Sequence, residues 1–159
     1  MAIRLSQFLE PTRISLSLRA HDRAAVLPEV ARLLADHPDM ANFDGFYQEL
    51  LARDRLDTTC LGNGVALPHA RTEHVRRIVV AVGRSDAGIH YDESPPPVRL
   101  LLVLGTPKAN PGVYLALVSC LCRLVKDSAS RDALLAAPTP EAFIATVVAL
   151  ENKLLGPGT

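Results

Sequence analysis

Two apolar runs in the middle of the chain restrict its fold more than any other feature. One covers residues 78–82 and is rich in β-branched residues, and the other covers residues 98–104. Short runs of this composition are typical of buried strands. The segments around them carry apolar residues at the spacing of amphipathic helices. We therefore expect an α/β chain in which strands alternate with helices.

The expected helices are recognised by their caps and their apolar spacing. Asp22 and Asn42 are suitable N-caps for two helices in the first third of the chain. A third helix is expected over residues 113–126, and a shorter one passes through residues 134–135. Thr139 is the expected N-cap of the last helix, which has proline at its first position.

The remaining segments are expected to form one further strand and three connections. Apolar and polar residues alternate over residues 14–18, a pattern typical of a half-buried strand. Residues 83–88 and 92–97 are predicted as loops, the second because three consecutive prolines do not fit a central strand. Residues 105–112 form a connection rich in glycine and proline. We expect function in these connections, because sites are usually assembled on loops that a sheet holds.

The composition excludes several classes of function. In 159 residues the 17 basic and 17 acidic side chains give a formal net charge of zero, so no excess of positive charge faces the phosphates of a nucleic acid. Three tyrosines, four phenylalanines and no tryptophan are too few for a base-stacking surface. Binding to nucleic acid is therefore not expected.

The cysteines and the N-terminal segment indicate the cellular compartment of such a chain. Cys60, Cys120 and Cys122 are odd in number and suit reduced thiols. On a helix the last two would point to different faces. The first residues contain charges and no apolar stretch typical of a signal peptide, and no run approaches the length of a membrane span. We expect a soluble cytoplasmic protein without membrane insertion.

His69 has the most unusual setting of the five histidines. It follows Pro68 at the end of a short extended segment, and small residues surround it. A neutral imidazole has a free nitrogen lone pair and is a good phosphoryl acceptor near neutral pH. His69 could equally be a hydrogen-bonded histidine at the end of a strand. The spacing to His74 and His90 contains no metal-binding motif, so no metal and no cofactor are expected.

A phosphoryl acceptor needs partners for negative charge. Arg53 could direct two N–H donors to phosphoryl oxygens, although an arginine at the exposed end of a helix is the simpler interpretation of the local sequence. Thr59 could add a hydroxyl donor. Backbone amides around Asn63, which lies between two glycines, could form an anion-binding nest. The spacing matches neither a P-loop nor a dinucleotide fingerprint.

The segment from Arg53 to Arg71, RDRLDTTCLGNGVALPHAR, resembles the signature of phosphotransferase-system EIIA domains of the fructose/mannitol type. That signature has an Arg-Glu pair, a Ser/Thr-Thr pair and then Gly-x-Gly-Val-Ala-Ile/Leu-Pro-His. The resemblance continues through residues 98–104 and the helix that ends at residues 123–127, so it covers nearly the whole chain. The N-terminal segment resembles the nitrogen-regulatory branch, in which a free-standing EIIA is a regulator.

The resemblance implies a single EIIA domain over residues 1–159, with a mixed sheet of about five strands flanked by helices on both faces. It implies a phosphocarrier that accepts a phosphoryl group on His69 from an HPr- or NPr-like protein, with onward transfer to an EIIB partner in sugar-transporting relatives. The family carries the phosphoryl group on Nε2, so a backbone acceptor is expected at Nδ1. Arg53 falls at the family's active-site arginine, and Thr59 falls at the threonine of the Ser/Thr-Thr pair.

Two residues depart from the family pattern. Asp54 stands in place of glutamate and keeps the charge. Tyr114 stands where the family has a histidine beside the phosphoacceptor. A tyrosine hydroxyl can donate one hydrogen bond to a phosphoryl oxygen, but it cannot become a cation near pH 7. We therefore expect His69 to accept a phosphoryl group whose lifetime or onward transfer is altered.

A second function stays open at this stage. The chain could be a non-catalytic interaction module with the EIIA fold that binds a transcription factor, a sensor kinase or a potassium transporter. The departure at Tyr114 favours this alternative, and it leaves open whether the chain counts as an enzyme. An unrelated metal-dependent enzyme is a more distant alternative. The sequence names neither a sugar nor a regulated target.

Overall fold

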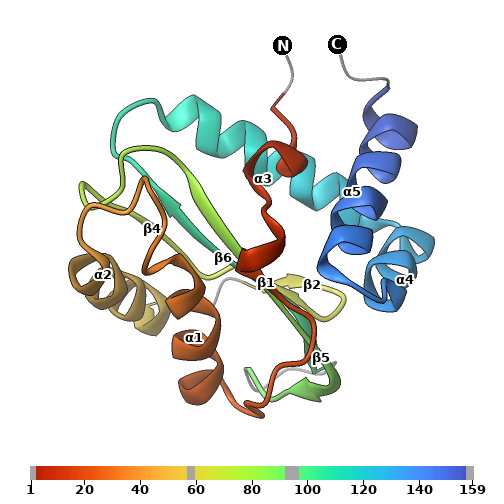
Figure 1. Cartoon of the computed structure of the whole chain (residues 1–159), viewed down its shortest axis with the longest axis horizontal. Coiled ribbons are helices and arrows are strands. Elements are labelled where there is room, and N and C mark those ends of the chain that lie inside the picture. Colours follow the sequence, from red (N-terminus) through yellow and green to blue (C-terminus); the bar gives the residue numbers. More distant parts are fainter. Residues whose placement is uncertain (1–2, 57–59, 92–96, 157–159) are drawn as a thin grey trace.

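The computed structural model describes residues 3–56, 60–91 and 97–156, and its centre is a six-stranded sheet (Figure 1). The strands follow the order β1-β5-β6-β3-β2, and β4 also pairs with β6. Their bounds are β1 Ile14–Ser15, β2 Cys60–Gly62, β3 Val65–Ala66, β4 His69–Arg71, β5 Val79–Ile89 and β6 Val98–Thr106.

The sheet is mixed, as the resemblance predicts. β6 pairs antiparallel with β5 along one edge and parallel with β3 and β4 along the other. β1 is parallel to β5, and β2 is antiparallel to β3. β3 and β4 follow one another along the same edge of β6, separated by Leu67 and Pro68. They therefore act as one interrupted strand.

Five α-helices and three short 3-10 helices accompany the sheet within the described ranges. They are η1 Leu5–Phe8, η2 Pro11–Arg13, α1 Arg23–Ala31, η3 Arg32–Leu34, α2 Phe43–Leu56, α3 Pro111–Lys126, α4 Ser128–Ala136 and α5 Pro140–Leu155. The predicted caps accept hydrogen bonds from backbone N–H groups, at 2.9 Å for Asp22, 3.1 Å for Asn42 and 3.0 Å for Thr139. No helix in the described part of the chain is long and apolar enough to cross a membrane.

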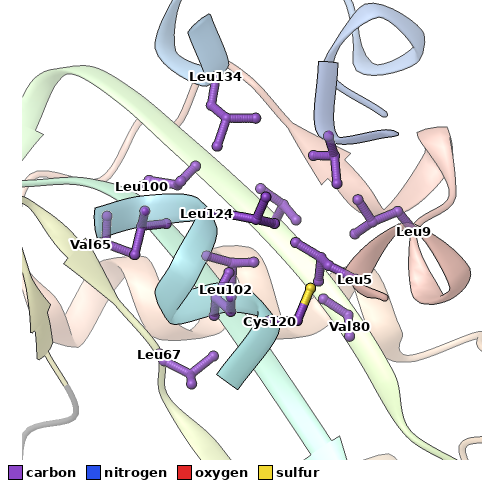
Figure 2. Packing of buried hydrophobic residues seen from close by; sticks show 14 of the residues in the cluster. Leu5, Leu9, Val65, Leu67, Val80, Leu100, Leu102, Cys120, Leu124 and Leu134 are labelled. Carbon is purple, nitrogen blue, oxygen red and sulfur yellow. The ribbon is translucent and has the colours of Figure 1, made fainter. Parts of the chain in front are cut away.

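Buried apolar residues form one cluster on each face of the sheet. β6 contributes to both, because alternate residues of a strand face opposite sides. Leu100, Leu102 and Leu104 belong to the cluster that α3, α5 and the N-terminal segment cover (Figure 2). Leu101 and Val103 belong to the cluster that α1 and α2 cover. The expectation of helices on both faces is confirmed.

The predicted loop over residues 83–88 is wrong, because these residues continue β5. Gly83 pairs with Leu101 of β6 and lies under α1. A Cβ atom at Gly83 would lie 2.5 Å from Val30 Cγ2 and 2.8 Å from Leu18 Cδ1. The glycine therefore permits close packing of a helix on the strand and does not end the strand.

Two other predicted segments are shorter in the structure. β1 ends at Ser15, although a strand is predicted over residues 14–18. The connection predicted over residues 105–112 is reduced to residues 107–110, because Gly105 and Thr106 pair with β4 and α3 already begins at Pro111. In the predicted loop over residues 92–97, residues 92–96 lie outside the described residues.

The close approach at Gly83 gives a test of the fold. Gly83→Ala is expected to lower the free energy of unfolding by about 1–3 kcal/mol, because the new methyl group overlaps Val30 and Leu18. Gly112→Ala is the matched control, since a Cβ there meets no atom within 4 Å. In helix α3 that change is neutral or stabilises by up to about 1 kcal/mol. Urea unfolding measures both, and equal values for the two variants would contradict the packing described.

Candidate functional site

The sequence suggests that His69 ends a short extended segment. In the structure His69 is instead the first residue of β4. Its ring is half-buried, and Nδ1 lies 3.0 Å from the carbonyl oxygen of Leu67. A carbonyl oxygen only accepts hydrogen bonds, so Nδ1 carries the proton and donates. The lone pair of the neutral ring is then on Nε2. The backbone acceptor expected at Nδ1 is confirmed.

The interruption between β3 and β4 creates this contact. Leu67 points into the cluster under α3, and the carbonyl oxygen of Pro68 accepts a hydrogen bond from Leu104 N at 3.0 Å. β6 therefore remains bonded across the interruption, while the Leu67 carbonyl is free to hold the imidazole. The sequence Leu-Pro-His thus places the acceptor carbonyl two residues before the histidine that it holds.

Tyr114 lies against this histidine from the first turns of α3. The ring centroids of His69 and Tyr114 are 5.4 Å apart, with an angle of 29° between the ring planes. Such an arrangement is a stacked contact. β4 and α3 therefore bring His69 and Tyr114 together.

Arg53 extends the site from the last turn of α2, where it is half-buried. Burial lowers the pKa of His69 below its ordinary value of 6.5, and the positive charge of Arg53 acts in the same direction. The Leu67 carbonyl and the charge of Asp54 oppose this effect without cancelling it. The neutral, nucleophilic form of His69 is therefore favoured at neutral pH.

The hydroxyl of Tyr114 is a proton donor at neutral pH. Burial raises its pKa above the usual value of 10.0, and the positive charges of Arg53 and Arg71 partly offset that rise. The site can therefore offer a neutral nucleophile, an un-ionised hydroxyl and permanent positive charge to an electrophile that carries negative charge.

Asp54 is buried beneath the site and holds the end of α2 in place. It accepts hydrogen bonds from Arg23 Nε at 2.5 Å and from the hydroxyl of Tyr91 at 2.8 Å. Arg23 also donates to the carbonyl oxygen of Asp54, and its guanidinium carbon lies 5.2 Å from the centroid of the Tyr91 ring. These contacts position the backbone next to Arg53, a role that the sequence analysis did not detect.

Arg71 is a further residue whose charge acts at Tyr114, and it was not predicted from the sequence. It lies two residues after His69 on the same strand, and its charge acts on Tyr114. The signal was present, because residues two apart on a strand face the same side.

Of the other predicted binding residues, the structure describes Asn63, and it lies away from His69. Asn63 has a φ of 59° in the exposed turn before β3. That turn lies beside Arg99 and Leu100 of β6, whereas His69 pairs with Leu104. No contact joins Asn63 to His69 within the described residues. Thr59 lies outside the described residues, as does its neighbour at position 58.

The structure describes the side chains of two of the three cysteines. Cys120 is buried and Cys122 is exposed, which confirms that they lie on different faces of α3. The side chain of Cys60 lies outside the described residues. Within the described ranges no three His, Cys, Asp or Glu side chains gather in a way that could hold a metal ion.

Comparison with known families identifies the class of protein that carries this site. Residues 7–149 match the family model described as "Phosphoenolpyruvate-dependent sugar phosphotransferase system, EIIA 2". The chain therefore belongs to this family of EIIA-type phosphocarriers.

Within this family the chain is similar to nitrogen regulatory proteins. It is 34% identical over 153 residues to the nitrogen regulatory protein of Pseudomonas aeruginosa, a match that covers 94% of this chain and 98% of that protein. The crystal structure of nitrogen regulatory protein IIA-Ntr from Neisseria meningitidis has a TM-score of 0.82 at 26% identity, covering 90% of this chain and 98% of that one. The resemblance to the nitrogen-regulatory branch is confirmed.

Sugar-specific relatives share the same fold. The crystal structure of IIA mannitol from Escherichia coli has a TM-score of 0.74 at 18% identity and covers 87% of this chain and 98% of that chain. The mannitol/fructose-type fold expected from the signature is therefore confirmed.

The electrostatics of His69 can be measured directly. Its NMR titration midpoint is expected below 6.5, because burial and the charge of Arg53 disfavour the imidazolium. Arg53→Met removes one of these causes, so the midpoint should rise. Arg32→Met, in an exposed position on η3, is the control and should leave it unchanged. A midpoint that does not respond to Arg53→Met would show that the two side chains do not interact.

Proposed function

We propose that the chain is a phosphocarrier that accepts a phosphoryl group on Nε2 of His69 from a phosphohistidine of an HPr- or NPr-like protein. The observation that supports this most directly is the contact of Nδ1 with the Leu67 carbonyl, 3.0 Å long, which leaves the Nε2 lone pair available. The lowered pKa of His69 keeps that lone pair unprotonated at neutral pH.

The transfer balances without a cofactor. The Nε2 lone pair of His69 attacks the phosphorus atom, and the P–N bond of the donor phosphohistidine breaks as the new N–P bond forms. The donor imidazole departs with the electron pair of the broken bond. The Nδ1 proton of His69 stays hydrogen-bonded to the Leu67 carbonyl. Because acceptor and leaving group are both imidazoles, the step is readily reversible.

Arg53 and Tyr114 are the proposed partners of the transferred group. The guanidinium can direct two N–H donors to phosphoryl oxygens, and the un-ionised hydroxyl can donate one more hydrogen bond. Thr59 remains a proposed hydroxyl donor on the strength of the family signature. Asn63 remains a proposed binding residue because backbone amides between two glycines can form an anion-binding nest.

Exposed apolar side chains support docking of a protein partner around the site. In the described part of the chain the large exposed apolar residues are Leu56, Val113, Leu115 and Val148. Three of them lie on the end of α2 and the start of α3, the elements that carry Arg53 and Tyr114. An apolar rim suits a partner that must approach closely and leave again. Enzyme IIA mannitol of Escherichia coli, which has a similar fold, forms a complex with phosphorylated enzyme IIB mannitol.

The similarity to nitrogen regulatory proteins supports a regulatory role for phosphorylation. In this proposal the cytoplasmic protein forms one domain over residues 1–159 and exchanges a phosphoryl group with its carrier. It then signals its state to a target protein. A sensor kinase or a potassium transporter is the kind of target we propose, and an EIIB domain is a further acceptor.

Intact-mass analysis tests the transfer. Incubation with phosphoenolpyruvate, enzyme I and the carrier protein should add one phosphoryl group to the wild type. His69→Gln should abolish the addition, because the nucleophile is lost. His90→Gln, which changes an exposed histidine, is the control and should leave phosphorylation intact. A wild type that gains no phosphoryl mass would refute the carrier proposal.

The second candidate is an interaction module with weakened relay activity, and Tyr114 is the observation that favours it. A tyrosine in contact with His69 cannot supply the positive charge that a histidine could. In this version phosphorylation of His69 acts as a switch for binding, or is lost.

Replacing the tyrosine tests whether Tyr114 belongs to the phosphoryl site. Tyr114→His should slow hydrolysis of the phosphoryl group by about three- to tenfold, because an imidazolium can form a charge-assisted hydrogen bond with it. The effect should grow as the pH falls below about 6.5, the ordinary histidine pKa. Tyr114→Phe keeps the ring and removes only the hydroxyl. Unchanged hydrolysis rates in both variants would place Tyr114 outside the phosphoryl site.

A further inference from the structure

Arg71 lies on the same side of β4 as His69. In this three-residue strand Ala70 is buried in the cluster under α1 and α2, while His69 is half-buried and Arg71 is exposed. Alternate residues of a strand face the same side. The Arg71 side chain therefore leaves the strand on the face of the sheet where Tyr114 stacks against the imidazole of His69.

The backbone of the connection before α3 holds this guanidinium. Arg71 Nη2 donates a hydrogen bond to the carbonyl oxygen of Lys108 at 2.9 Å. This is the only hydrogen bond of the Arg71 side chain within the described residues, and no carboxylate there forms an ion pair with it. An arginine has five N–H donors. The anchored group therefore keeps donors available for an anion.

The positive charges of two arginines on different elements act on the hydroxyl of Tyr114. Arg53 is on α2 and Arg71 is on β4, and the charges of both act on Tyr114. Tyr114 in turn has its ring centroid 5.4 Å from that of His69. Two permanent positive charges therefore act on the side chain that stacks on the imidazole.

The charge of a phosphoryl group requires more than Arg53 supplies. A phosphoryl group attached to a side chain carries about −1.5 to −2 charges at pH 7. Arg53 contributes one positive charge, and Tyr114 contributes none near neutral pH. The second balancing charge must come from another residue of the pocket or from solvent.

We infer that Arg71 binds the phosphoryl group on His69 together with Arg53, and that the Lys108 carbonyl holds its guanidinium in position for this contact. The inference rests on the proposed phosphocarrier function. It makes Arg71 the cation that stands in for the family's second histidine, with a charge that does not titrate near neutral pH. The bond to Lys108 also connects the phosphoryl group to the connection that leads into α3.

The first test uses inorganic phosphate and the unphosphorylated protein. Phosphate is titrated into the wild type at constant ionic strength, and the NMR signals of the His69 and Tyr114 rings are followed. Arg71→Gln should weaken binding by about tenfold or more, because a charge-assisted contact is lost. Arg71→Lys keeps the charge but lacks the paired N–H donors of the guanidinium. Its affinity for phosphate should lie between those of the wild type and Arg71→Gln.

The second test uses the phosphorylated protein. The 31P resonance reports the second ionisation of the phosphoryl group. Two nearby guanidinium groups should hold the midpoint of this ionisation at low pH. In Arg71→Gln this midpoint should move to higher pH, and hydrolysis of the group should become about tenfold faster, because a charge-assisted contact is lost. If Arg71 only anchored the connection, Arg71→Gln would leave the midpoint unchanged, and Arg71→Lys would have no shift to reverse.

Arg99→Gln is the matched control for both tests. Arg99 is an exposed arginine on β6 near the opposite end of that strand from Leu104, the partner of His69. Its removal changes the net charge equally, so it reproduces any effect of long-range attraction. Thermal unfolding of all variants checks that the fold is intact.

The outcomes separate this inference from the carrier proposal. The role of Arg71 would be overturned if Arg71→Gln bound phosphate with an affinity within twofold of Arg99→Gln and had the same 31P midpoint as that control. A wild type that takes up no phosphoryl group would refute the carrier proposal. In that case the phosphate titration still decides whether Arg71 forms an anion site.

Discussion

The pairing of β6 with its two neighbours determines where the rest of the molecule lies. One edge is bonded to β5 from Val79 opposite Gly105 to Ile89 opposite Val98, and the other edge receives β3 and β4. The side chains of β6 supply both apolar clusters, so the helices on each face pack against the same strand. The register that places His69 opposite Leu104 is therefore set by the most extensively paired strand of the sheet.

The site forms where the two helical layers meet at one end of this strand. α2 belongs to the layer on one face and α3 to the layer on the other, and β4 lies between them (Figure 1). Each layer contributes one element to the surroundings of His69, which are the end of α2 with Arg53 and the start of α3 with Tyr114. The anchor of Asp54 on Arg23 and Tyr91 holds the first of these elements in place.

Sequence reasoning predicted what depends on local pattern. The apolar runs of β5 and β6, the caps of three helices and the signature around His69 are all contained in short segments. Gly83 was misjudged because a glycine that ends a strand and a glycine that admits a helix look the same locally. Contacts between distant segments, such as that of Arg23 with Asp54, leave no periodic signal.

The carbonyl of Leu67 has a chemical consequence beyond orienting the ring. An imidazole can be phosphorylated on either nitrogen, and the two products are different regioisomers. Because Nδ1 donates its proton to Leu67, only the nitrogen farther from the backbone is available as a nucleophile. In the proposed phosphocarrier, a single main-chain oxygen in the interruption between two strands would therefore select one isomer of the phosphohistidine, and with it the distance at which the added group projects from the backbone.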